Sequence, residues 1–199
     1  NKKIIAAVDC TGHGVPGAFM SMLGYSFLSE IVSNSPIIKA DEILNRLREY
    51  IIKALHQKQE IGYGKDGMDI SLCIIDESNQ TLEFAGAYQY MLFMRNDQVT
   101  TYQGDKMPIG IHYKQKSTFT LKEVKYQKGD TFYLFSDGFT DQFGGEYGKK
   151  FRLKNFQDLL LTIQDEPMMR QKEILEKSLA NWKSSYEQVD DILVMGIRL

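Results

Sequence analysis

Six short strand-like segments between residues 68 and 135 constrain the fold of this chain more than any other feature of its sequence. They are rich in β-branched and aromatic residues, and turn-forming clusters such as 76–79, 96–97 and 128–130 lie between them. Most of the connections are only a few residues long, and connections that short join antiparallel strands. The pattern therefore predicts antiparallel hairpins, with strands at residues 70–75, 81–85, 90–95, 99–102, 119–126 and 131–135.

Helical patterns flank this central region on both sides. A strand at 4–8 is followed by two helices, at 15–32 and 40–58, in which apolar residues recur three and four positions apart. Two consecutive helices after one strand argue against a parallel βαβ unit, which would need a strand in place of the second helix. Phe19, Met20 and Met22 are assigned to the core. Two more helices, at 155–163 and 168–182, and a strand at 192–199 complete the chain.

These elements predict an α+β fold, an antiparallel β-sandwich flanked by helices, in a single domain over residues 1–199. The 24 basic and 26 acidic residues give a net charge of −2, which does not favour binding to nucleic acid or to an anionic membrane. No apolar run approaches the roughly 20 residues that a membrane span needs. The two cysteines, Cys10 and Cys73, lie in separate apolar runs and are expected to be reduced thiols in the cytoplasm.

Three aspartates stand at the ends of predicted strands that are far apart in the sequence. Asp9 follows the strand at 4–8, Asp137 follows the strand at 131–135, and Asp190 precedes the last strand. Strand ends hold side chains rigidly, and carboxylates are preferred ligands of hard cations such as Mg²⁺ and Mn²⁺. Each aspartate alone also fits a turn or a helix cap. The three together favour a metal site.

The glycine loop after Asp9 allows a different interpretation. Gly12, Gly14 and Gly17 match the spacing of a dinucleotide-binding turn between a strand and a helix. That motif requires a second strand ending in an acidic residue about twenty positions later. Here a proline-containing loop and a helix occupy the region, so nucleotide binding is the weaker interpretation.

The segments around the three aspartates resemble the signature blocks of the PP2C-type (PPM) phosphatases, in the bacterial branch of SpoIIE and RsbU. The blocks cover 9–18, 136–141 and 190–192, and 84–87 and 106–110 resemble further landmarks of the family. Leu193 stands where the family usually has threonine. The resemblance extends from residue 4 to the last residue.

This resemblance implies α-β-β-α layers and a metal-dependent serine/threonine protein phosphatase with two divalent cations, Mn²⁺ or Mg²⁺. Asp9 would bridge both cations, the backbone carbonyl of Cys10 would be a ligand, and Asp137 and Asp190 would hold one ion. The substrate would be a phosphorylated protein of the anti-sigma-factor antagonist type. The alternative is a PP2C-like module that binds a partner without turnover. A homodimer is left open, and no membrane contact is expected.

The family usually has an earlier strand that carries a Gly-Asp pair near the metals. The chain opens on Asn1, so we expect this domain to be truncated at its start and to lack that first strand. His13 is expected to be a loop residue rather than a general acid. Asp141 fits either a water ligand near the metals or a turn residue, and the role of Asp191 is left open.

Overall fold

The computed structural model describes residues 2–12, 14–34, 39–57, 66–112 and 118–199. The chain forms two compact units, and neither is a continuous segment. The first contains Asn1–Tyr90 and Gln103–Lys125, and the second contains Met91–Tyr102 and Tyr126–Leu199. The units therefore alternate along the sequence.

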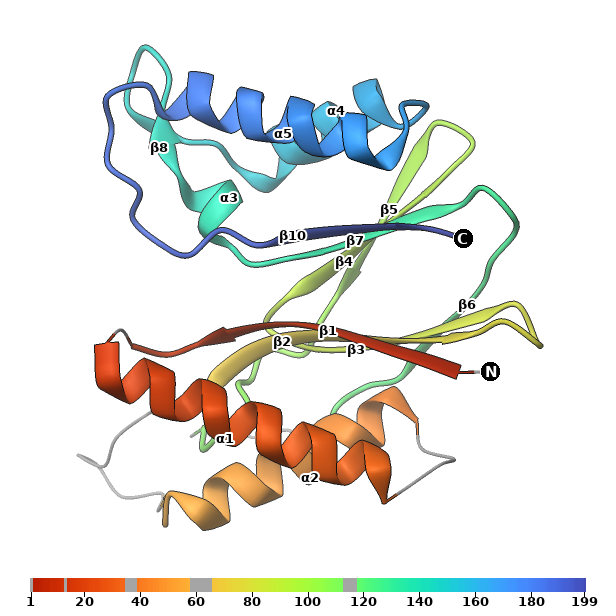
Figure 1. Cartoon of the computed structure of the whole chain (residues 1–199), viewed down its shortest axis with the longest axis vertical. Helices are drawn as coiled ribbons and strands as arrows, with labels where there is room; N and C mark the ends of the chain where they lie inside the picture. Colours follow the sequence, from red (N-terminus) through yellow and green to blue (C-terminus); the bar gives the residue numbers. More distant parts are fainter. Residues whose placement is uncertain (1, 13, 35–38, 58–65, 113–117) are drawn as a thin grey trace. The chain divides into compact units, whose positions relative to one another are not determined.

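An antiparallel sheet with the strand order β1-β2-β3-β6 forms the centre of the first unit. Its strands are β1 (Lys2–Cys10), β2 (Met68–Asp76), β3 (Thr81–Ala87) and β6 (Lys122–Lys125). Helices α1 (Gly14–Ser33) and α2 (Ala40–Ala54) lie along one face of this sheet (Figure 1). Strand β1 is at the edge of the sheet.

Side chains alternate between the two faces of β1 and β2, as the strand geometry requires. One set packs into the core beside the helices: Ile4, Ala6, Val8 and Cys10 of β1, with Met68, Ile70, Leu72 and Ile74 of β2. The intervening residues, among them Asp9 on β1 and both Asp69 and Ser71 on β2, project from the opposite face. The alternation and the strand register thus place Asp9, Asp69 and Ser71 on the same face of the sheet.

Helix α1 packs against this core through Met20, Gly24, Phe27 and Ile31. The assignment of Phe19 and Met22 to the core was wrong, because these side chains are 55% and 71% exposed. They lie on the other side of the helix from the stripe at positions 20, 24, 27 and 31, whose spacing matches the helical period. Nearly every residue of α1 is apolar or small, so composition did not distinguish the two sides.

By length and composition alone, α1 is long and apolar enough to cross a membrane, contrary to the expectation that no run reaches that length. The core helix of a soluble protein also passes this test. Met20 and Ile31 of α1 pack into the first unit's core, and 22% of the apolar window is buried.

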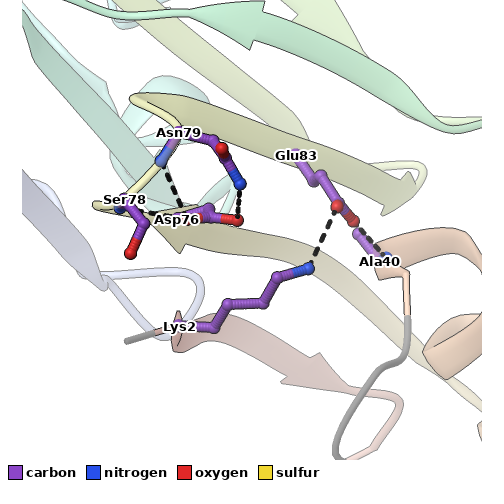
Figure 2. A network of polar contacts seen from close by, with 6 residues as sticks. All are labelled: Lys2, Ala40, Asp76, Ser78, Asn79 and Glu83. Carbon is purple, nitrogen blue, oxygen red and sulfur yellow. Dashed lines mark hydrogen bonds and ion pairs between the residues drawn. The ribbon is translucent and has the colours of Figure 1, made fainter.

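Glu83 connects the sheet to the first turn of α2 (Figure 2). Its carboxylate accepts a hydrogen bond from the backbone N–H of Ala40 at 3.1 Å, and Lys2 lies 3.7 Å from its other oxygen. A negative charge at a helix N-terminus is favourable, because the first N–H groups have no partner within the helix. In the turn after β2, Asp76 accepts bonds from the N–H groups of Ser78 and Asn79 (Figure 2).

The second unit contains an antiparallel sheet with the strand order β10-β7-β4-β5, and helices lie on one face of it (Figure 1). Its strands are β4 (Tyr90–Arg95), β5 (Gln98–Gln103), β7 (Thr131–Phe135) and β10 (Val194–Arg198), and its long helices are α4 (Leu153–Ile163) and α5 (Met168–Lys183). Asn96 and Asp97 both have positive φ angles, 49° and 59°, as a tight hairpin turn requires.

The largest differences between the predicted elements and the structure concern β6, α2 and three short elements that were not predicted. Strand β6 covers only Lys122–Lys125, because the N–H groups of Phe119 and Thr120 bond to the side chains of Asn45 and Asp105 instead of to a strand. Helix α2 ends at Ala54, and residue 58 lies outside the described residues. The sequence also gave no sign of three short elements: α3 (Gly138–Asp141), β8 (Phe143–Gly144) and β9 (Lys149–Lys150).

Candidate metal centre

Asp9 is the penultimate residue of β1, and the chain turns after it into α1 through a glycine-containing loop. Gly12 has a φ of 94°, a conformation that other residues rarely adopt. A Cβ on Gly17 would lie 2.6 Å from the carbonyl oxygen of Gly12, so the loop packs closely on the helix start. The glycines therefore fix the path of the chain directly after Asp9.

The backbone carbonyl of Cys10 is directed away from β2. Cys10 is opposite Met68, whose N–H and carbonyl both bond to Ile109, at 3.2 and 2.9 Å. In an antiparallel strand the N–H and carbonyl of one residue point to the same side, so Cys10 faces Met68 as a non-hydrogen-bonded pair. Because β1 is an edge strand, this carbonyl points outward from the sheet. That direction is compatible with its predicted role as a ligand.

Asp137 lies two residues after the end of β7 and directly precedes the short helix α3. Phe135 and Phe139, two positions before and after it, belong to an aromatic cluster. The rings of Phe135 and Phe139 lie 5.0 and 4.7 Å from the ring of Phe156 on α4, measured between centroids. Phe139 also contacts Phe151 in an edge-to-face arrangement, at 5.2 Å. Residues two positions before and after Asp137 are therefore buried, and the loop between them has little freedom.

Asp190 lies in the loop that leads into β10, and this loop is bonded to the residues around Asp137. Ser136 donates its hydroxyl to the carbonyl of Asp191 at 2.8 Å and accepts the N–H of Leu193 at 3.0 Å. A Cβ on Gly138 would lie 2.3 Å from the same carbonyl of Asp191, so only glycine fits there without a shift of the backbone. The two acidic loops are thus in close contact through their backbones.

As a result, the carboxylates of Asp137 and Asp190 come together within the second unit. An oxygen of Asp137 lies within 4.8 Å of an oxygen of Asp190. Partial burial raises the pKa of Asp137, the negative charges of Asp190 and Asp141 raise it further, and Lys150 opposes them. This pair would be stabilised by a positive charge between the two groups.

Two carboxylates at this separation fit a hard divalent cation, which binds oxygen ligands at about 2.0–2.6 Å. Asp9 belongs to the first unit, and its convergence with Asp137 and Asp190 on one site stays a prediction.

The remaining acidic and histidine candidates are placed as follows. The carboxylate of Asp141 pairs with Lys150 at 2.6 Å, at the end of α3. Asp191 contributes its backbone carbonyl to the bond with Ser136, and its N–H bonds to the side chain of Asp190 at 2.8 Å. His13 lies outside the described residues. The roles of Ser136 and Gly138 were not predicted, although both residues belong to the motif around Asp137.

The nucleotide-binding interpretation of the glycine loop is wrong for the described part of the chain. Strand β1 pairs with β2 in the antiparallel sense, and α1 is followed by the helix α2 rather than by a parallel strand. A dinucleotide-binding turn depends on a parallel βαβ unit.

Comparison with protein families gives a match over residues 2–199 to the family described as stage II sporulation protein E (SpoIIE). A search of curated proteins gives no match to the chain.

Solved structures with PP2C-type phosphatase domains have the same fold. The SiaA-PP2C domain of Pseudomonas aeruginosa matches with a TM-score of 0.86 and 30% identity, over 98% of this chain and 75% of that one. The PP2C phosphatase domain of SpoIIE from Bacillus subtilis, solved with a fragment of its regulatory domain, matches with a TM-score of 0.77 and 18% identity. The RsbU and RsbW domains of a Mycobacterium tuberculosis protein match with a TM-score of 0.75 and 18% identity.

The present chain is almost completely covered in the last two matches, but it spans only 55% and 51% of those proteins. The predicted fold class, an α+β fold with antiparallel sheets and helices, is confirmed, and so is the resemblance to the SpoIIE and RsbU branch.

Proposed function

We propose, on the premise that this chain belongs to the SpoIIE family of PP2C-type phosphatase domains, that it hydrolyses phosphoserine or phosphothreonine on a protein substrate. The observation that carries this proposal is the Asp137–Asp190 pair, held within 4.8 Å by loops that are bonded to each other. Each of these aspartates lies in a signature block of the family, and so does Asp9. The three aspartates that the resemblance assigns to the metal site are therefore all present in the sequence.

We further propose that Asp9, Asp137, Asp190 and the carbonyl of Cys10 hold two divalent cations, Mn²⁺ or Mg²⁺. Such cations, when bound, supply Lewis acidity toward water and toward the phosphoryl oxygens. The chain itself supplies position: Ser136 and Gly138 fix the Asp190 loop against Asp137, and the aromatic cluster anchors Phe135 and Phe139. A site built in this way needs little rearrangement when the phosphate group arrives, which favours catalysis by pre-organised charge.

The proposed substrate is a small phosphorylated protein of the anti-sigma-factor antagonist type, and the proposed location is the cytoplasm. Membership of the SpoIIE family supports this, as does the presence of RsbU and RsbW domains in one of the similar structures. With a net charge of −2, the chain has no overall positive field to attract a phosphoprotein. Recognition therefore depends on groups close to the metal centre.

The test is hydrolysis of p-nitrophenyl phosphate and of a phosphoserine peptide by the chain, with Mn²⁺, with Mg²⁺ and after chelation. We expect turnover that requires metal and that is lost when Asp137 is replaced by asparagine. As a matched control, Asp158→Asn changes an exposed aspartate of α4 that pairs with Lys154, and should leave turnover unchanged.

Metal binding without any turnover on either substrate would instead support the alternative, a PP2C-like module that binds a phosphorylated partner. Absence of both metal binding and turnover would contradict the proposed function.

A further inference from the structure

A fourth aspartate, Asp69, faces Asp9 across the ladder between β1 and β2. The two residues are direct partners in the antiparallel register. Side chains of such partners project from the same face of the sheet, with Cβ atoms about 4.5–5.5 Å apart. Both are on the face opposite to α1 and α2, because their neighbours Val8, Cys10, Met68 and Ile70 pack into the core beside these helices. Asp69 lies in none of the three signature blocks.

Like charges directly opposite each other destabilise a sheet. Both aspartates are only partly exposed, so water screens their repulsion less than it would at an open surface. A divalent cation bound by both carboxylates would turn this repulsion into attraction.

Ser71 is a second and independent feature of the same row of side chains. It is two residues from Asp69 on β2, on the same face, and its side chain is 0% exposed. Among the described residues, its hydroxyl oxygen has no hydrogen-bond partner. Its neighbours on the adjoining strands are Ala7 and Gly86, which carry no polar side chain. A buried hydroxyl without a partner is costly, and such groups commonly bind a water or an ion.

Alternate residues of a strand are about 7 Å apart, a distance that one water molecule bound to a cation can bridge. The row of side chains on β2 therefore offers a carboxylate and, behind it, a hydroxyl that can donate to or accept from such a water. We propose that Asp69 binds, together with Asp9, one of the two divalent cations, and that Ser71 holds a water of that cation. This inference rests on the proposed function and adds two residues to its site.

The same sheet contains a second pair of opposed acids, Glu83 on β3 and Glu123 on β6. In this pair Glu83 accepts the N–H of Ala40 and lies near Lys2. Replacing Glu123 therefore also removes one of two opposed acids, but at a place with no predicted metal. Glu123→Gln is the matched control for Asp69→Asn.

The experiment is calorimetric titration of the metal-free chain with Mn²⁺, together with its melting temperature without metal. For Asp69→Asn we expect Mn²⁺ affinity at one site to fall about tenfold or more. Glu123→Gln should bind Mn²⁺ like the original chain. Ser71→Ala, which removes the buried hydroxyl, should raise the metal-free melting temperature and weaken Mn²⁺ binding.

Unchanged Mn²⁺ affinity in both Asp69→Asn and Ser71→Ala would overturn this inference. If Asp9→Asn nevertheless abolished binding at a site, the proposed function would stand without Asp69. If Asp69→Asn failed to fold, the Ser71→Ala titration would decide the matter. An original chain that binds no Mn²⁺ would overturn both the inference and the proposed function.

Discussion

Ser136 and Asp191 are joined by a hydrogen bond of 2.8 Å, from the serine hydroxyl to the aspartate's backbone carbonyl. The same hydroxyl accepts the N–H of Leu193, and the N–H of Ser136 donates to the carbonyl of Leu193 at 3.1 Å. One small side chain thus connects the residue before Asp137 with the residue after Asp190. The spacing of the two carboxylates depends on this connection.

Replacing Ser136 by alanine should therefore affect stability and metal binding together. The change leaves the carbonyl of Asp191 and the N–H of Leu193 without their side-chain partner, which costs about 1–3 kcal/mol of unfolding free energy. We also expect weaker Mn²⁺ binding, because the Asp190 loop is no longer fixed. Urea denaturation and calorimetric titration measure the two effects. Thr162→Ala removes a hydroxyl bonded to a backbone carbonyl within α4 and should leave Mn²⁺ affinity unchanged. Equal Mn²⁺ affinities in the two variants would contradict the prediction.

Asp9→Asn and Asp137→Asn each retain the size of the side chain but remove a charge. We expect each variant to lower metal-dependent turnover of p-nitrophenyl phosphate by at least about a hundredfold, because a lost charged ligand weakens both cation binding and stabilisation of the transition state. The circular dichroism spectrum should not change, since relieving repulsion among carboxylates does not harm the metal-free fold. Lost folding with normal specific activity in the remaining folded protein would show that these aspartates are structural.

The raised pKa of Asp137 predicts how the stability of the metal-free protein depends on pH. Partial burial, with the charges of Asp190 and Asp141, raises this pKa above its unfolded value of about 3.9. A carboxyl group whose pKa is higher in the folded state contributes stability at pH values below its unfolded pKa, where it is protonated. This contribution is lost as the pH rises through its folded pKa. Metal-free Asp137→Asn should therefore melt at a higher temperature than the original chain at pH 7. The difference should shrink as the pH falls toward about 4, and a difference independent of pH would count against this explanation.

A buried contact between Tyr133 and Gln171 predicts a loss of stability away from the metal centre. Tyr133 donates its hydroxyl to the side-chain oxygen of Gln171, and burial raises the pKa of Tyr133 to about 12. Tyr133→Phe leaves this oxygen without its donor and should lower the unfolding free energy by about 1–3 kcal/mol, measured with urea.

The control for this contact is Tyr147→Phe, whose side chain is 75% exposed. It should change the unfolding free energy by less than about 0.5 kcal/mol. Equal losses in the two variants would show that the Gln171 contact contributes nothing specific.

Most helices and strands could be predicted because their hydrophobic residues repeat with a clear helical or strand period. Turn residues such as Asn96 and Asp97 also separate the strands. The assignment of Phe19 to the core failed for a physical reason: α1 has almost no charged residue to mark its solvent side. The short element α3 was missed because four residues are too few to show a period.

In the candidate site, too, some residues could be found from local sequence patterns, and others only from contacts between distant segments. Asp137 and Asp190 could be selected from their positions at strand ends and from the family motifs. That Asp69 lies opposite Asp9 follows only from the register of β1 with β2, which pairs residues sixty positions apart. The packing of Gly138 against Asp191 likewise depends on contacts that no local pattern contains.

The alternation of the two units along the sequence has a consequence for how the chain reaches its native state. The first unit is interrupted by β4 and β5, and its sheet is complete only once β6 has been synthesised. At that moment the apolar β4 still lacks its partner β7, and β7 in turn needs β10 at the far end of the chain. Pairings between such distant segments make folding slow and leave strand edges exposed during synthesis. Neither unit corresponds to a continuous fragment, so no single cut of the chain separates one unit from the other.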